Sequence, residues 1–108
     1  MKYTIYTLKE CATCEEFIRL FNEARVDLTI KDIKEKVGWE EGKYRWEQID
    51  LTEEFGVPGS FVPLVLIEKD NYRKLFAGGK KGQEKEDVEI FESHEDGIDK
   101  LSKILNTK

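Results

Sequence analysis

The sequence predicts an α/β fold in which a mixed central sheet of about four strands is flanked by helices. Tyr3–Leu8 is built from β-branched, aromatic and aliphatic residues, as a strand requires, and from Phe17 onward apolar residues recur with the spacing of one helix face. Phe61–Ile67 is apolar at nearly every position, which is typical of a central strand covered on both sides. With 108 residues, the chain is long enough for one domain, residues 1–108, with a hydrophobic core of its own.

The stretch after the first helix predicts an edge strand and then a less regular segment. Val26–Ile33 alternates apolar and polar residues at first, so we expect an edge strand that runs parallel to the first strand. Residues 34–59 carry a weaker pattern, for which two interpretations fit: an extra strand over Tyr44–Leu51, or a helix that Gly56 ends. The inner face of that helix would hold Trp46, Ile49 and Phe55.

A hairpin is predicted in the second half of the chain. Phe61–Ile67 and Tyr72–Ala77 are expected to pair as antiparallel strands across a turn at Asp70-Asn71, and the pair ends at Gly78-Gly79. A central strand tolerates proline only near its start or at an irregularity. The Val62–Pro63 bond is therefore a candidate for a cis peptide.

The last part of the chain is charged and rich in glycine until a helix closes it. Val88–Phe91 is predicted as a short additional strand after a surface loop over residues 80–87. Ser93–Asp96 has the form of a capping box, and the apolar spacing after it predicts a helix. His94 is expected to be an exposed residue of this cap without a functional role.

The two cysteines, Cys11 and Cys14, lie between the first strand and the first helix. This places Cys11 at the helix N-terminus, where unpaired backbone N–H groups favour a thiolate, and Cys14 one turn further along. Such settings lower the cysteine pKa from about 8.5 to roughly 3.5–7.5, so Cys11 is predicted to be the attacking sulfur and Cys14 its resolving partner. A structural zinc site needs about four ligands, and His94 is the only other soft donor, so the ligand count falls short.

Charge and hydropathy exclude several classes of function. A net charge of −5 argues against non-specific binding to nucleic acid, which needs clustered cations. The first residues lead directly into a strand without the pattern of a signal peptide, and no run of 18 apolar residues could span a membrane. We therefore expect a cytoplasmic protein with no membrane partner, in which the cysteine pair cycles between reduced and oxidised forms.

The order of strand, Cys-X-X-Cys, helix, strand, helical segment, Val-Pro strand, strand, Gly-Gly and helix resembles glutaredoxins, a branch of the thioredoxin superfamily, over nearly the whole chain. The matching segments are Lys9–Cys14, Val62-Pro63 and Gly78-Gly79. The resemblance implies a thioredoxin-like (glutaredoxin-type) three-layer fold in which a cis Pro63 faces the disulfide. It also implies glutathione contacts from Lys9 to a carboxylate, from the backbone of Val62 to the cysteine, and from the loop at Gly78 and Gly79 to the γ-glutamyl end.

Four features of the sequence depart from the glutaredoxin pattern. Lys9 lies only one residue away from Cys11, which is closer than the usual spacing. Ala12 and Thr13 stand where the family usually has proline and tyrosine, and Phe61 stands where threonine commonly precedes Val-Pro. Lys80-Lys81 replaces the acidic residue that normally follows the glycine pair and meets the ammonium group of glutathione. We therefore expect weak glutathione binding, with Asp96 as an alternative partner for the ammonium group.

These residues predict a thiol–disulfide oxidoreductase, an electron carrier that reduces protein or glutathione mixed disulfides without a tightly bound cofactor. Its expected partners are protein disulfides and, as electron donor, glutathione or a thioredoxin-reductase-type enzyme, and the protein is expected to be a monomer. The alternative is a carrier in which Cys11 of two chains and two glutathiones hold a [2Fe–2S] cluster. An interaction domain without activity is disfavoured because both cysteines are present.

Overall fold

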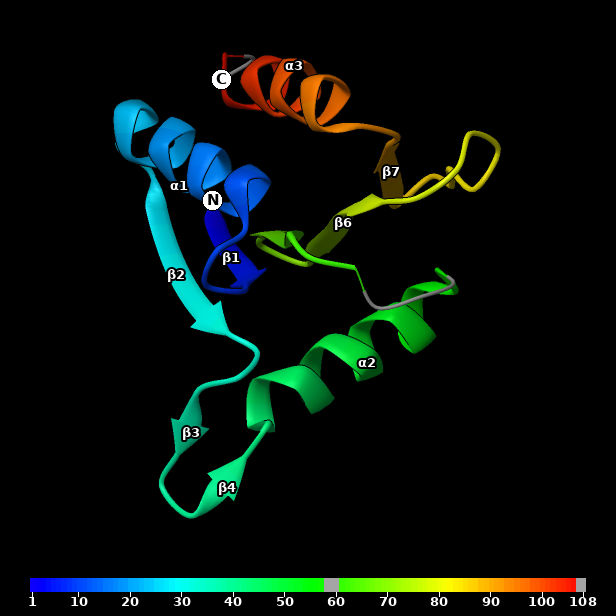
Figure 1. The fold of residues 1–108 in the computed structure, drawn as a ribbon. Coiled ribbons are helices and arrows are strands. Elements are labelled where there is room, and N and C mark those ends of the chain that lie inside the picture. Colours follow the sequence, from blue (N-terminus) through cyan, green and yellow to red (C-terminus); the bar gives the residue numbers. More distant parts are fainter. Residues whose placement is uncertain (58–60, 107–108) are drawn as a thin grey trace.

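A five-stranded mixed sheet lies between two layers of helices in the computed structural model, which describes residues 1–57 and 61–106 (Figure 1). The order of the strands in the sheet is β2-β1-β5-β6-β7. The prediction of about four strands is wrong, because the short segment at residues 88–91 joins the sheet as a fifth strand. The elements are β1 (Lys2–Thr7), α1 (Ala12–Ala24), β2 (Asp27–Asp32), β3 (Lys36–Val37), β4 (Glu40–Glu41), α2 (Lys43–Phe55), β5 (Leu64–Lys69), β6 (Tyr72–Gly78), β7 (Val88–Phe91) and α3 (His94–Asn106).

The strand directions follow the predictions. β2 lies at the edge of the sheet and runs parallel to β1, because the intervening helix returns the chain to the same end. β5 and β6 form an antiparallel hairpin, and Asp70 at its turn has a φ of 52° in the left-handed region. β5 is central but begins only at Leu64, so Pro63 precedes the strand instead of interrupting its hydrogen bonds. The Val62–Pro63 peptide bond is cis, as predicted.

Two hydrophobic clusters fill the space on the two faces of the sheet. Alternation along the strands divides their side chains between these clusters: in β5, Leu64 and Leu66 pack toward α2, whereas Val65 and Ile67 pack toward α1 and α3. α1 and α3 lie side by side on one face in Figure 1, and α2 covers the other face. The result is a helix, sheet and helix sandwich whose central strands are buried on both sides.

α2 confirms the helical interpretation of the weak segment and contradicts the alternative strand over Tyr44–Leu51. The predicted inner face is wrong at Trp46, which is 66% exposed. The helix carries polar and charged residues on every side, so its apolar spacing did not define the buried face. Gly56 ends the helix with a φ of 69°, as predicted. The residues that α2 buries are Gln48, Leu51, Thr52 and Phe55.

A small hairpin precedes α2. β3 and β4 pair as antiparallel strands around Gly38 and Trp39, an element that the sequence did not predict. Pro58 and Gly59, which end the weak segment of the sequence, lie outside the described residues. Across residues 1–57 and 61–106, none of the helices combines the length and the apolar character needed to cross a bilayer.

Candidate active site

The strand directions bring the predicted site residues to one end of the sheet, where the connecting segments enter and leave the strands. β1 and β5 are antiparallel with Tyr6 opposite Leu64, so the end of β1 lies beside the start of β5. Ala77 of β6 also lies opposite Leu64, so β6 finishes at this end of the sheet too. β7 runs parallel to β6 with Phe91 opposite Gly78, which brings the start of α3 to the same end of the sheet. Four connecting segments therefore meet there: those that follow β1, β6 and β7, and the one that precedes β5.

The cysteine pair has the geometry that the sequence predicted. Cys11 is the N-cap residue of α1, and its sulfur accepts a hydrogen bond from the backbone N–H of Cys14 at 3.2 Å. The two cysteines form a disulfide within the chain, with Cα atoms 5.2 Å apart. Cys11 is half-buried, whereas Cys14 is 1% exposed. Cys11 is therefore the sulfur that an incoming disulfide can reach first.

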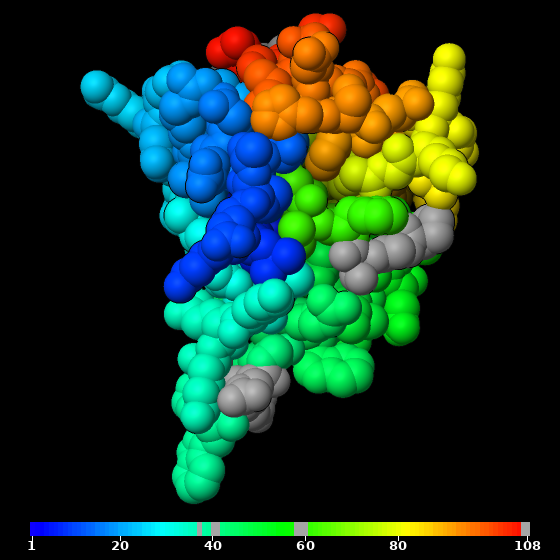
Figure 2. All heavy atoms as spheres, in the orientation of Figure 1, coloured from blue at the N-terminus to red at the C-terminus, as the bar shows by residue number. Residues whose placement is uncertain are grey.

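His94 lies beside the cysteine pair, which the sequence did not predict. Its Nδ1 and the hydroxyl of Thr13, which lies between the two cysteines, form a hydrogen bond of 2.7 Å. His94 is exposed, as expected, and is the first residue of α3. In Figure 2 the dark-blue start of α1 lies directly below the orange start of α3. This contact joins residues 81 positions apart, so only the parallel pairing of β6 and β7 could have revealed it.

A pocket of about 590 Å³ opens beside this hydrogen bond. Val62, Gly78 and Gly79 line it together with His94, so three of the four residues predicted to bind glutathione lie around one cavity. The fourth, Lys9, lines a separate pocket of about 390 Å³ with Glu10 and other polar residues of the neighbouring loops. The structure thus does not bring Lys9 together with the other three.

Gln48 of α2 holds the segment that leads into Val62 and Pro63. Its side chain is completely buried, and its Nε2 donates a hydrogen bond of 2.9 Å to the carbonyl oxygen of Phe61. This bond pairs the amide nitrogen, whose burial without a partner would be costly. The buried Oε1 has no hydrogen-bond partner among the described residues. Sequence reasoning missed Gln48, since a single polar residue in a charged helix gives no signal of burial.

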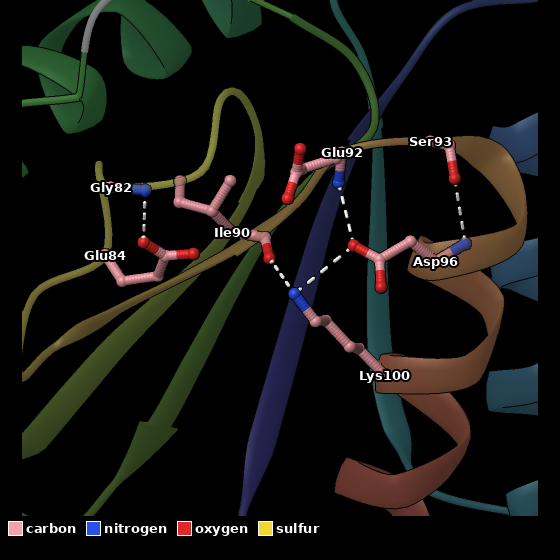
Figure 3. Close-up of polar contacts among 7 residues, drawn as sticks. All are labelled: Gly82, Glu84, Ile90, Glu92, Ser93, Asp96 and Lys100. Carbon is pink, nitrogen blue, oxygen red and sulfur yellow. Dashed lines mark hydrogen bonds and ion pairs between the residues drawn. The ribbon is translucent and has the colours of Figure 1, made fainter.

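Asp96 and Glu92, two of the acidic residues near the pocket, differ in the way their carboxylates lie (Figure 3). Asp96 Oδ2 accepts a hydrogen bond from the backbone N–H of Glu92 at 2.9 Å and forms an ion pair with Lys100 at 3.2 Å. The Glu92 N–H is the main cause that lowers the pKa of Asp96 below its ordinary value. The carboxylate of Glu92, which lines the pocket, points away from this network. Glu92 is therefore better placed than Asp96 to meet a bound ammonium group.

The capping box of α3 is formed in part as predicted. Ser93 Oγ accepts a hydrogen bond from the backbone N–H of Asp96 at 3.1 Å. The returning carboxylate reaches the N–H of Glu92, one residue beyond the usual position. Lys100 extends the network by donating to the carbonyl oxygen of Ile90 at 2.6 Å (Figure 3). The wall of the pocket is thus tied to both β7 and α3.

The part of the chain that the structure describes does not gather metal ligands at one place. Among the described residues, no three His, Cys, Asp or Glu side chains are grouped so that they could hold a metal ion. A [2Fe–2S] cluster shared between two chains would draw on Cys11 of each chain, so this alternative stays a prediction. Its test is visible absorbance after anaerobic purification.

Comparisons with known proteins give no further assignment. No family model, curated protein or solved structure matches the chain. The function is therefore inferred from the arrangement of Cys11, Cys14 and Pro63 at one end of the sheet and from the pocket beside them.

Proposed function

We propose that the protein is a glutaredoxin-like thiol–disulfide oxidoreductase with a thioredoxin-like fold. One observation carries this proposal: a Cys-X-X-Cys disulfide at the N-terminus of α1, with Cys11 accessible and Cys14 buried. Backbone N–H groups at a helix start favour a thiolate, and a buried second cysteine within one turn is suited to resolve a mixed disulfide. A purely structural disulfide at this spacing would close almost no loop and would add little stability.

The fold supports the same proposal. A thioredoxin-like domain combines a parallel pair like β1 and β2 with an antiparallel hairpin like β5 and β6, and helices cover both faces of the sheet. β7 and the β3–β4 hairpin are additions to this arrangement. Pro63 directly precedes β5. It therefore lies at the end of the sheet where the chain leaves β1 and enters the cysteine loop.

The reaction proceeds by two thiol–disulfide exchanges. The Cys11 thiolate attacks a substrate disulfide, forms a mixed disulfide and releases one substrate thiolate, which takes up a proton. Cys14 then loses its proton and attacks the sulfur of Cys11, which releases the second substrate thiol and forms the Cys11–Cys14 disulfide. The substrate has gained two electrons, and two electrons from glutathione or from a reductase return the protein to the dithiol form.

Glutathione is proposed as a poor electron donor for this site. Its ammonium group would meet Glu92 in the pocket, and one carboxylate would meet Lys80. Lys9 lies in the neighbouring pocket, so it could pair with the other carboxylate only if the tripeptide extended past Cys11. Exposed pairs of this kind contribute at most about 1 kcal/mol each, so a poor fit weakens the affinity by several-fold without abolishing it.

A turnover assay with two electron donors tests the proposed function. The rates of the wild-type protein, Cys11→Ser and Cys14→Ser would be measured in two assays. In one, insulin is the substrate and thioredoxin reductase supplies the electrons; in the other, the substrate is a glutathione mixed disulfide, and glutathione with glutathione reductase supplies the electrons. We expect the protein to turn over both substrates, with the protein disulfide favoured. Cys11→Ser should lower both rates to the buffer rate, because it removes the attacking thiolate. Cys14→Ser should accumulate a mixed disulfide with insulin, because nothing resolves it.

Two results would contradict the proposal. One is a wild-type rate equal to the buffer rate with both substrates. The other is a Cys11→Ser variant that keeps the wild-type rate, which would show that the reaction does not pass through this thiol.

A further inference from the structure

The pocket beside the cysteines has an apolar wall of which the expected glutathione contacts use only the backbone of Val62. Phe61 is a large aromatic residue with 61% of its surface exposed, and it lines the pocket together with Val62 and Phe91. Exposed apolar surface of this size, gathered in a cavity, commonly marks a binding site. Covering it with another apolar group removes that surface from water.

Gly78, the last residue of β6, leaves this space open. A Cβ at Gly78 would lie 3.4 Å from the ring of Phe91 and 3.9 Å from the Cβ of Phe61. Gly78 therefore lies at the junction of the two aromatic residues, and its missing side chain is part of the cavity. Its φ is outside the left-handed region, so the backbone itself does not require glycine here.

The apolar wall is continuous with the cysteine site. Val62 lies in the wall and is bonded to Pro63, which precedes β5 beside the end of β1. On the other side, His94 lines the pocket and is hydrogen-bonded to Thr13, between the cysteines. In Figure 2 the bright-green atoms of the residues just after position 60 lie between the dark-blue atoms near the N-terminus and the yellow atoms. The orange atoms lie above them. A substrate whose sulfur reaches Cys11 can therefore extend into the pocket.

The charges around the pocket suit a polypeptide better than a small anion. Lys80 and Glu92 bring opposite charges to the rim, so neither sign dominates. Gln83 is engaged, because its Oε1 accepts a hydrogen bond of 2.7 Å from the backbone N–H of Lys80. Strongly polar side chains gather instead around the separate pocket that contains Lys9. A few polar groups around an apolar wall are typical of sites that bind an apolar group in a defined orientation.

We propose that this pocket binds a large aliphatic or aromatic side chain next to the reacting cysteine of a polypeptide substrate, and that Phe61 determines this specificity. The proposal rests on the proposed function and adds the substrate class to it. A substrate that buries such a side chain between Phe61 and Phe91 is held with its sulfur near Cys11. A substrate with a small polar neighbour gains no such contact.

A single-turnover assay with peptide disulfides tests the proposal. Short peptides that differ only at the residue beside their cysteine (Leu, Phe, Ser or Asp) would be joined to thionitrobenzoate through a disulfide and mixed with the fully reduced protein. The Cys11 thiolate attacks the peptide sulfur and releases thionitrobenzoate, which absorbs visible light. We expect the Leu and Phe peptides to react about tenfold faster than the Ser peptide, as partial burial of one apolar side chain predicts.

Three variants locate the preference. Phe61→Ser removes the exposed ring, and Gly78→Ala places a methyl group between Phe61 and Phe91, so each should reduce the Leu-to-Ser rate ratio to about twofold or less. Trp46→Ser is the matched control, because Trp46 is an equally exposed aromatic residue on α2 outside this pocket, and it should keep the wild-type ratio. Circular dichroism and the urea midpoint of each variant verify that it is folded.

The outcomes separate this proposal from the proposed function. Equal rates for all peptides, with reaction still abolished by Cys11→Ser, would overturn the specificity and leave the oxidoreductase function intact. A ratio that persists in folded Phe61→Ser and Gly78→Ala would also overturn it, because the preference would then arise elsewhere. If the protein reacts no faster than a free thiol at the same pH, the proposed function itself fails.

Discussion

Opposing electrostatic effects act on the sulfur of Cys11. The start of α1 presents backbone N–H groups to it, and the N–H of Cys14 already lies 3.2 Å away. Glu10 and Glu15 flank the pair with negative charge. The helix terminus contributes about 0.3–1 kcal/mol to an anion, and direct hydrogen bonds add to this. Exposed carboxylates act through water, whose high dielectric constant limits the effect of each to about 1 kcal/mol or less. The helix start should therefore prevail.

This balance predicts that the thiol of Cys11 ionises below the pH typical of free cysteine. In the reduced protein, the rate of iodoacetamide alkylation at Cys11 should reach half of its maximum well below pH ~8.5, because the thiolate is the reacting form. The measurement follows the alkylated peptide by mass spectrometry from pH 4 to 10. A denatured sample provides the unperturbed cysteines for comparison. A midpoint equal to that of the denatured sample would show that the helix start does not stabilise the thiolate.

At the level of elements, α3 packs on the sheet through a glycine. A Cβ at Gly97 would lie 2.9 Å from the ring of Phe17 and 3.0 Å from the ring of Phe91, closer than side chains approach each other. Alanine is about 1 kcal/mol better than glycine in a helix interior, but forcing a methyl group into a packed core costs about 1–3 kcal/mol. Since Phe17 is completely buried and cannot move aside freely, the packing cost should exceed the gain in helix propensity.

Gly97→Ala is therefore expected to lower the free energy of unfolding by about 1 kcal/mol, which urea unfolding of the oxidised protein would measure. Asp99→Ala is the control, because it also introduces an alanine into the same helix but at an exposed position, where no packing cost arises. A Gly97→Ala variant as stable as the protein itself would mean that the helix can shift outward at little cost. The pocket would then widen as well, because Phe91 both contacts Gly97 and lines the pocket.

The elements that the sequence predicted are those whose signals are local. The β5–β6 hairpin combines an apolar run, a turn at Asp70 and a return strand within 15 residues, so its partners were evident from adjacent sequence. The buried face of α2 depends on Gln48 and Thr52, whose burial follows from the packing of distant strands and not from their polarity. β3 and β4 are two residues long, which is too short for any alternation to be visible.

The candidate site divides in the same way when the whole molecule is considered. Cys11, Cys14 and Pro63 were predicted because each lies at a local signal, a helix start or a proline in an apolar run. His94 and Glu92 were not, because their place at the site depends on the pairing of β7 with β6 after a nine-residue loop. Asp96 was named from its position in the sequence, but its carboxylate is engaged by Glu92 N–H and Lys100.

A partly buried polar contact joins α2 to the sheet and is expected to make the stability of the whole molecule depend on pH. Glu47 of α2 accepts hydrogen bonds from the hydroxyl of Tyr6 in β1 at 3.0 Å and from Lys31 in β2 at 2.7 Å. Tyr6 and Lys31 are neighbours across the two strands. Burial alone would raise the pKa of Glu47, but these two hydrogen bonds and the charge of Lys31 outweigh it and lower the pKa. Burial and the contact with Glu47 raise the pKa of Tyr6.

Because the pKa of Glu47 is lower in the folded state than in the unfolded state, its contribution is present above the ordinary glutamate pKa of 4.5 and is lost as the pH falls through the folded value. Glu47→Gln carries no charge at any pH, so it should be less stable by about 1 kcal/mol at pH 7 and should lose less stability on acidification. Urea unfolding of the oxidised protein at pH 7, 5, 4 and 3 measures both effects. Glu53→Gln, at an exposed position of the same helix, should keep the acid dependence of the protein. If Glu47→Gln and the protein lost stability in parallel as the pH fell, the Tyr6–Glu47–Lys31 contact would not be the link between α2 and the sheet that responds to acid.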